Sequence, residues 1–178
     1  GVRMMTSYIR VGGVAKDATR PWLDGIRDFI DYFPAKVDEY ERLLTRNPIW
    51  LDRTEGIGVF TREEAIDWSL SGPALRASGV NWDIRKSHPY SGYDNYKFDV
   101  PVFKNGDIYD RYRVRVEEMR QSRIIIKQAM ERLPTGDYKT PDNKVSLPDR
   151  DTLHTSMEAL IHHFKLVSEG ISVPKGDT

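Results

Sequence analysis

The stretch that decides the fold is Phe98–Ser122, FDVPVFKNGDIYDRYRVRVEEMRQS. It opens with an extended piece that stops at a proline, because proline lacks the N–H that a strand or helix interior uses. Asn105 and Gly106 then predict a tight turn. Asp107 follows as the expected N-cap of the longest helix, which we predict over residues 107–133.

A second long helix is predicted over residues 20–46, where apolar side chains recur every three or four positions. Pro34 lies inside this pattern and removes one backbone donor, so we expect it to kink or split the helix. The Asn-Pro pair at positions 47–48 is expected to end the helix. Residues 49–60 are then expected to form a connector, with a short strand as an alternative.

Two further helices are predicted over residues 62–70 and 150–169. The first is preceded by Thr61, with a glutamate three residues on, which is the pattern of a capping box. Residues 79–106 are rich in Gly, Pro, Tyr, Asp and Asn and predict a long loop, of a length that is uncommon unless it is functional or packs on a partner. The expected fold class is mainly α, with small β elements and long ordered loops, in a single domain over residues 1–178.

Composition narrows the class of protein. Lys plus Arg and Asp plus Glu are both 27, and this balance argues against a nucleic-acid-binding protein, which usually has a basic excess. The chain has no cysteine, which excludes disulfides and thiolate metal sites within it. No apolar run approaches the roughly 18–20 residues of a membrane span, so membrane contact is expected only through partners. The chain begins at Gly1 and ends in a loop, and we interpret it as a fragment of a longer protein.

Histidines near the C-terminus form the first candidate site. His154, Glu158 and His162 are spaced by four residues, but a polar helix face with a Glu–His pair is favoured over a metal site. The adjacent pair His162-His163 must face two directions, and one imidazole is expected toward the apolar side. That arrangement indicates a possible proton relay, because the reference pKa of histidine is roughly 6.5, with a hydrogen-bonded core histidine as the favoured alternative.

The glycine pair near the N-terminus is the second candidate. Gly12 and Gly13 follow Arg10 and could bring backbone amides close to a cofactor. No GxGxxG or phosphate-binding loop sequence is present, so no nucleotide site is predicted. A plain turn is the favoured interpretation of the glycines taken alone.

Several strings in order along the chain resemble the quinone-site (D-type) subunit of proton-translocating NADH–quinone oxidoreductase, also called NADH dehydrogenase I or respiratory complex I. The similarity covers essentially the whole chain. The strings are Arg3-Met4, Tyr8–Val14, Asn47–Trp50, Arg53-Thr54, Ile57–Val59, Ser71-Gly72, Leu75–Gly79, Trp82–Lys86, Pro89-Tyr90, Tyr93-Asp94, the FDVP and YDRY pieces, Arg115–Ser122 and Thr155–Lys165.

The resemblance implies a fold and a setting. The family fold is similar to the large subunit of nickel–iron hydrogenases, and the function is electron transfer from NADH to quinone coupled to proton translocation. The implied partners are other complex I subunits, above all the one that carries the terminal iron–sulfur cluster, and the implied location is peripheral, on the cytoplasmic side of the cell membrane. This chain is expected to bind no cofactor itself, with quinone as substrate and the cluster on the partner.

The resemblance also implies which residues matter. The family's quinone ligands lie upstream of Gly1, so no catalytic residue carries over and the isolated fragment is expected to be inactive. The residues expected to face the cluster and the quinone chamber are Arg3, Arg10, Gly12 and Gly13, with Arg10 tuning local charge. The alternatives are a paralogous nickel–iron hydrogenase-type large subunit and a catalytically silent scaffold.

Overall fold

The computed structural model describes residues 3–171 and 175–176. The chain divides into two compact units, a helical unit of residues 21–133 and a terminal unit drawn from residues 1–20 and 134–178. Helices dominate and one small sheet of two strands is present, which confirms the mainly α class. No helix in these described ranges is long and apolar enough to cross a membrane. That residues 1–178 form a single domain stays a prediction.

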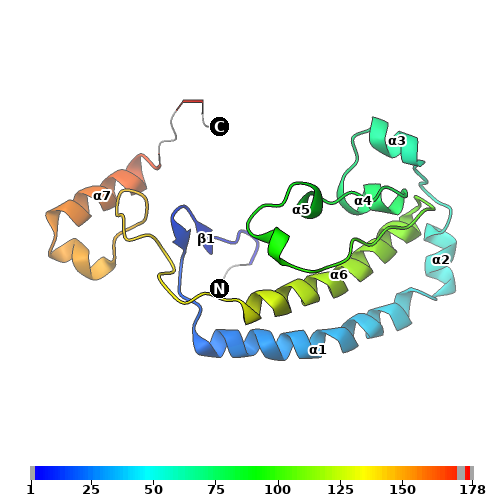
Figure 1. Cartoon of the computed structure of the whole chain (residues 1–178), viewed down its shortest axis with the longest axis horizontal. Helices are drawn as coiled ribbons and strands as arrows, with labels where there is room; N and C mark the ends of the chain where they lie inside the picture. The colour runs from blue at the N-terminus through cyan, green and yellow to red at the C-terminus, as the bar shows by residue number, and fades with distance from the viewer. Residues whose placement is uncertain (1–2, 172–174, 177–178) are drawn as a thin grey trace. The chain divides into compact units, whose positions relative to one another are not determined.

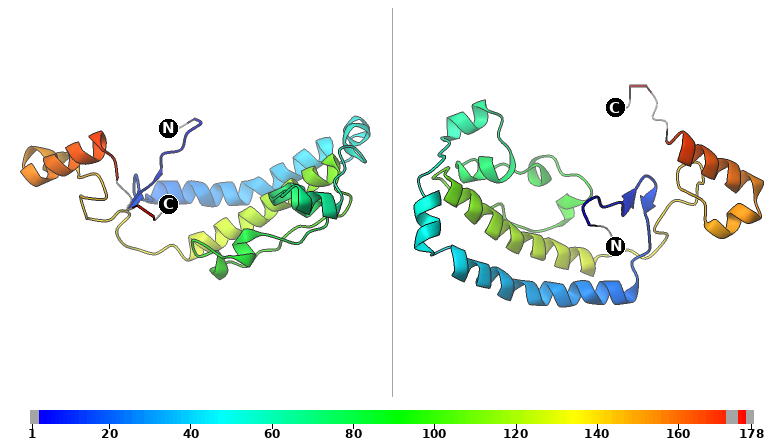
Figure 2. Two further views of the ribbon diagram at one scale, coloured as in Figure 1. Left: turned by 90° about the horizontal axis from the view of Figure 1, so that it is seen from above. Right: turned by 180° about the vertical axis from the view of Figure 1, so that it is seen from behind.

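The helical unit is built around one long central helix, α6, which has α1 on one side and short helices on the other (Figure 1). The same order is visible from behind (Figure 2, right). In chain order its elements are α1 (Arg20–Leu44), α2 (Pro48–Thr54), α3 (Arg62–Asp67), α4 (Gly72–Ala77), α5 (Ile84–Ser87), the 3-10 turn Tyr93–Asn95 and α6 (Ile108–Glu131).

The start of α6 confirms the prediction made from the sequence. Asp107 is its N-cap: one side-chain oxygen accepts the Asp110 N–H at 2.7 Å, and the other accepts the Gly56 N–H at 2.9 Å. The Asp110 carboxylate in turn accepts the Asn105 N–H at 2.8 Å. Both carboxylates are only 1% exposed, and buried charge is tolerated only when it is hydrogen-bonded. They therefore tie two loops to the first turn of α6.

Gly106 sits at the centre of the same junction. Its carbonyl accepts the Phe60 N–H and its own N–H donates to the Ala77 carbonyl, both at 3.0 Å. Its φ of +68° lies in the left-handed region, and a Cβ at this position would stand 2.0 Å from the Phe60 carbonyl oxygen. Three segments meet here at a distance that only glycine permits.

Helix α1 runs unbroken through Pro34, so of the two expected outcomes the split is wrong, while the kink stays a prediction. Proline has no N–H for the carbonyl one turn earlier, which belongs to Ile30. The Arg123 side chain of α6 replaces it, because its Nε donates to the Ile30 carbonyl oxygen at 2.8 Å. Arg120, on the same helix, forms ion pairs with Asp38 and Glu41 of α1. Side chains of α6 thus support α1 where its backbone lacks a hydrogen bond.

The Asn-Pro pair at 47–48 begins a helix as well as following one. Residues 49–60 were expected to form a connector, but α2 occupies their first part. The Asn47 side-chain oxygen accepts the N–H of Ile49 at 3.0 Å and of Trp50 at 3.4 Å. Asn at the N-cap and Pro at the first helical position form a recognised start signal, so this helix was predictable from the sequence.

Two other expected helices are shorter than predicted. The capping box of Thr61 and Glu64 is confirmed, with Glu64 Oε2 accepting the Thr61 N–H at 2.9 Å, and this bond holds the pKa of Glu64 below its usual value. However, α3 ends at Asp67, and the chain then turns through Ser69, whose φ is +54°.

The helix expected over residues 150–169 is two elements in the terminal unit. A 3-10 segment, η2 (Arg150–His154), comes first, and α7 (Met157–Ser168) follows. Ser156 caps α7 by accepting the Ala159 N–H at 3.3 Å. The break separates His154 from the helix that carries His162.

The long segment over residues 79–106 is mostly irregular, as expected, but it is well packed. The ring of Tyr93 lies 5.1 Å from that of Tyr90, 6.2 Å from that of Tyr96 and 6.5 Å from that of Phe98. The Arg85 guanidinium lies 4.7 Å from the centre of the Phe98 ring, a cation–π contact. Edge-to-face contacts between aromatic rings thus order a segment that has little regular secondary structure.

A buried charge cluster joins this segment to α6. The Arg76 side chain is 8% exposed; it pairs with Glu118 of α6 and donates to the Trp82 carbonyl oxygen at 3.2 Å. Asp83 lies 3.9 Å from Arg76 and 2.7 Å from Arg85. The hydrogen bond from Arg85 lowers the pKa of Asp83, so this carboxylate is ionised at neutral pH.

Candidate functional site

The glycine pair lies in a small hairpin of the terminal unit. Strand β1 (Ile9–Arg10) pairs antiparallel with β2 (Gly13–Val14), with Ile9 opposite Val14 and Arg10 opposite Gly13. The N–H of Ala15 extends the pairing by donating to the Tyr8 carbonyl oxygen at 2.8 Å.

A third segment, residues 138–140, is hydrogen-bonded to the hairpin although it lies far from it in the sequence. The Val14 N–H donates to the Tyr138 carbonyl oxygen at 3.0 Å, and the Thr140 N–H donates to the Gly12 carbonyl oxygen at 2.7 Å. A Cβ on Gly13, whose φ is +146°, would stand 2.4 Å from the Tyr138 oxygen. This close backbone approach is by itself a sufficient reason for glycine.

Replacing Gly13 with alanine is expected to detach residues 138–140 from the hairpin. Amide hydrogen exchange at Val14 and Thr140, the two donors of the contact, should then become at least about tenfold faster. Gly136→Ala is a matched control, because Gly136 has a φ of +145° and no described residue lies within 4 Å of its added Cβ. Equal exchange in the two variants would show that strain, and not the contact with Tyr138, sets the requirement for glycine.

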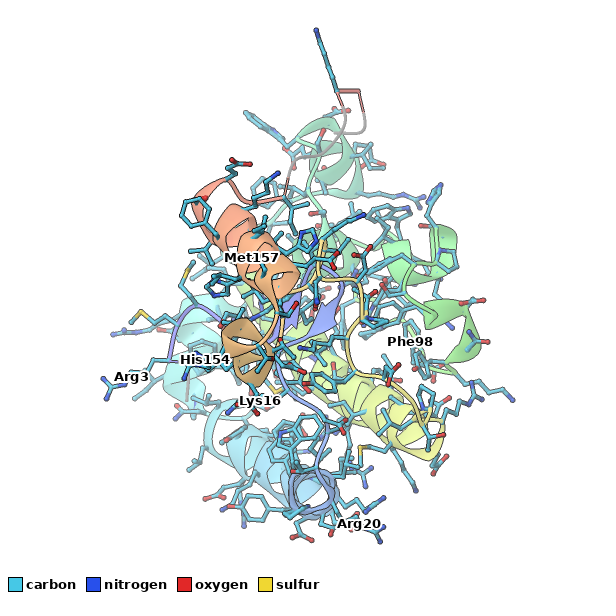
Figure 3. All side chains as sticks on the ribbon, turned by 90° about the vertical axis from the view of Figure 1, so that its left-hand side faces the viewer. Arg3, Lys16, Arg20, Phe98, His154 and Met157 are labelled. Atoms are coloured by element: carbon cyan, nitrogen blue, oxygen red, sulfur yellow. The ribbon has the colours of Figure 1, made fainter. Side chains whose placement is uncertain are left out.

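The two arginines expected to face the chamber are both exposed. The Arg10 side chain donates through Nε to the Ser7 carbonyl oxygen at 3.0 Å, and no carboxylate in the described part of the chain forms an ion pair with it. Arg3 also points away from the ribbon (Figure 3). Because no carboxylate in the described residues pairs with it, the charge of Arg10 is available to a group that approaches it.

Beside the hairpin the terminal unit has a cleft of about 620 Å³. We call it the basic cleft, because four of its lining side chains are cationic and one is acidic. Aliphatic side chains form most of the remaining walls, together with Tyr138, Ser146 and Pro148. The basic residues are Arg10, Lys16, Lys139 and Arg150, the acidic one is Asp149, and the aliphatic ones include Val11, Val145, Leu147, Leu166, Val167 and Ile171.

Of the predicted site residues, the structure brings Arg10 and Gly13 together at the basic cleft, whereas Arg3 is absent from its walls. Sequence reasoning missed Lys16 and Arg150. Neither belongs to a motif, and their proximity follows from the pairing of Gly12–Val14 with a segment more than a hundred residues away. No local pattern in the sequence could have indicated that pairing.

The histidines lie elsewhere in the terminal unit. His162 Nε2 is 3.5 Å from Glu158 Oε1, which confirms the expected Glu–His pair. Both belong to the wall of a separate polar cleft of about 330 Å³. His163 is partly buried, and the described residues offer no group of three metal-ligating side chains. The proton-relay role of His162 and His163 stays a prediction.

Comparison with known sequences gives a consistent result. A family described as "Respiratory-chain NADH dehydrogenase, 49 Kd subunit" matches residues 1–178. The chain is 51% identical over 177 residues to a D-type NADH-quinone oxidoreductase subunit of Koribacter versatilis and 52% identical over 177 residues to the one of a Wolbachia from Brugia malayi. It is 52% identical over 180 residues to one from Chloroflexus aurantiacus.

Each of these alignments covers 99% of the chain but only 44–45% of the relative. The chain therefore spans less than half the length of the relatives that it matches. The hydrogenase-type alternative is not favoured, and the resemblance read from the sequence strings is confirmed. On these grounds the chain belongs to the family of the 49 kDa subunit of respiratory-chain NADH dehydrogenase.

Proposed function

We propose that this chain is part of a subunit that forms the quinone-reduction chamber of respiratory complex I, where electrons from NADH reach quinone and proton translocation is driven. The observation that carries the proposal is the identity of about 51% to proteins named as NADH-quinone oxidoreductase subunits, along 99% of the chain. The proposed subunit has the fold of a nickel–iron hydrogenase large subunit and lies peripherally on the cytoplasmic side of the membrane.

The iron–sulfur cluster of this proposal belongs to a partner subunit. Such clusters are held by cysteine thiolates, and this chain contains no cysteine. We infer that the contribution of this chain to the cluster is electrostatic and structural. The neighbouring subunit with the terminal cluster is the proposed partner, and Arg3, Arg10, Gly12 and Gly13 are the proposed surface toward it.

Arg10 has the properties that such a role needs. It is exposed, it stands on β1, which pairs with β2 in the hairpin, and no carboxylate within the described ranges forms an ion pair with it. A cation near a cluster stabilises the reduced state, because reduction adds negative charge. Arg10 would thereby help the cluster to accept electrons before they pass to quinone.

Replacing Arg10 with glutamine in the assembled enzyme is expected to lower NADH:quinone reductase activity by about two- to tenfold, since each 1.36 kcal/mol in a barrier changes a rate tenfold. Arg10→Lys keeps the charge and should retain most of the activity. Arg62→Gln removes an exposed charge from the helical unit and serves as the control. Normal assembly with unchanged turnover in Arg10→Gln would refute the role of Arg10.

A further inference from the structure

The basic cleft has a charge excess that the chain as a whole lacks. The whole chain has a formal net charge of zero, but four cations and one carboxylate line this cleft, which leaves three positive charges in excess. The one carboxylate, that of Asp149, is already in an ion pair, because its Oδ1 accepts a hydrogen bond from Lys139 Nζ at 2.6 Å. Among the described residues, no ion pair involves Lys16 or Arg150, and both are exposed.

Most of the uncharged side chains that line the cleft are apolar. Its aliphatic walls come from the hairpin, from residues 145–147 and from the end of α7, and its volume of about 620 Å³ lies within the roughly 300–1,000 Å³ of known binding pockets. A small, fully hydrated anion would leave these walls in contact with water. The surface suits a ligand that combines negative charge with apolar groups.

The open edge of β1 points to a chain segment as this ligand. In an antiparallel pair, alternate residues turn their N–H and C=O groups to opposite sides. Tyr8 and Arg10 face β2, and Val14, opposite Ile9, turns its N–H away from β1 to Tyr138. Ile9 therefore presents its N–H and C=O at the outer edge, where its side chain is also 85% exposed. Such an edge can accept a further extended strand.

We propose that the basic cleft, together with the edge of β1, binds an extended protein segment whose acidic side chains alternate with apolar ones. Alternation places the acidic groups on one face of the extended segment and the apolar groups on the other. The carboxylates would pair with Lys16 and Arg150, and the apolar side chains would cover the aliphatic walls. An anionic lipid also combines negative charge with apolar groups. However, it has no peptide backbone that could pair with the strand edge.

Fluorescence anisotropy of a labelled peptide tests the proposal on the full 178-residue chain. The probe is a peptide of four Val-Glu repeats, with Val-Lys and Val-Gln peptides of the same length for comparison. The Val-Glu peptide should bind at least about tenfold more tightly than either, and its affinity should fall as salt is raised. Equal binding of the Val-Lys peptide would overturn the proposal, as would absence of binding to folded chain, with folding checked by circular dichroism.

Charge reversal locates the site. Lys16→Glu combined with Arg150→Glu should weaken binding of the Val-Glu peptide by about tenfold or more, whereas Arg62→Glu in the helical unit should leave it unchanged. Unchanged affinity in the double variant would overturn the assignment. Full displacement of the peptide by vesicles containing phosphatidylglycerol, but not by neutral vesicles, would also overturn it and indicate a lipid site.

A second measurement identifies the natural occupant and does not require the isolated chain to fold. A photo-reactive benzoylphenylalanine in place of Leu147, on the wall of the cleft, is cross-linked in the assembled enzyme and the product is sequenced. A protein segment with alternating acidic and apolar residues supports the proposal. Cross-linking to lipid, or to a segment without acidic residues, contradicts it. NADH:quinone turnover of the same preparation is measured separately, because its loss would bear on the proposed function and not on the cleft.

Discussion

Replacing Gly106 with alanine should lower the free energy of unfolding of the helical unit by about 4 kcal/mol or more, which is among the largest effects known for one substitution. The added Cβ would stand 2.0 Å from the Phe60 carbonyl oxygen, a backbone atom that cannot rotate away. Moving it would break the hydrogen bond from the Phe60 N–H and displace the loop that Asp107 anchors. Urea unfolding followed by tryptophan fluorescence measures this directly, because all four tryptophans of the chain lie within residues 21–133.

The variant Gly56→Ala distinguishes the cost of the steric clash at Gly106 from the cost of its left-handed backbone conformation. Gly56 has nearly the same φ, +69°, and nothing within 4 Å of an added Cβ. It should cost only about 1–2 kcal/mol, the usual cost of a left-handed conformation for alanine. Similar losses in the two variants would show that the tight junction at Gly106 contributes nothing beyond its dihedral angle.

Replacing Glu118 with leucine should cost about 3–5 kcal/mol, because it leaves the guanidinium of Arg76 buried without the carboxylate that it contacts most closely. Arg76 lies in the interior, and its Nε has no hydrogen-bond partner among the described residues. Asp83 compensates little, since it is 3.9 Å from Arg76 and pairs more closely with Arg85. The same tryptophan-monitored unfolding reports the loss.

Two further variants identify the cause. Glu117→Leu changes the neighbouring, half-exposed glutamate on α6 and should alter stability by less than about 1 kcal/mol. Arg76→Met combined with Glu118→Leu removes both charges and should recover most of the stability, because apolar pairs often replace buried ion pairs without loss. A double variant as unstable as Glu118→Leu alone would mean that Glu118 acts through packing and not through its charge.

The features that sequence reasoning predicted correctly depend on residues close together in the chain. The cap at Asp107 and the capping box of Thr61 and Glu64 each need only a side-chain oxygen and an amide three residues later. The mainly α class followed from helical periodicity for the same reason. The signal that begins α2, the N-cap Asn47 followed by a proline, is equally local. It was missed because the Asn-Pro pair also marks the end of the preceding helix, and only that meaning was considered.

The features that were missed depend on tertiary contacts. Pro34 does not split α1, because Arg123, nearly ninety residues later, occupies the Ile30 carbonyl. The requirement for glycine at position 13 comes from Tyr138, and the basic cleft forms only when residues 138–150 reach the hairpin. Periodicity and capping rules carry no information about which distant segments meet. In contrast, the resemblance of whole strings to the quinone-site subunit of complex I identified the family without any knowledge of these contacts.

We propose that this chain acts on electron transfer through the exposed charge of Arg10. A redox titration of the terminal iron–sulfur cluster in the assembled enzyme, read by electron paramagnetic resonance, tests it most directly. We predict that Arg10→Gln shifts the midpoint potential to lower values by roughly tens of millivolts and that Arg10→Lys does not. An unchanged potential in a correctly assembled Arg10→Gln enzyme would contradict the account.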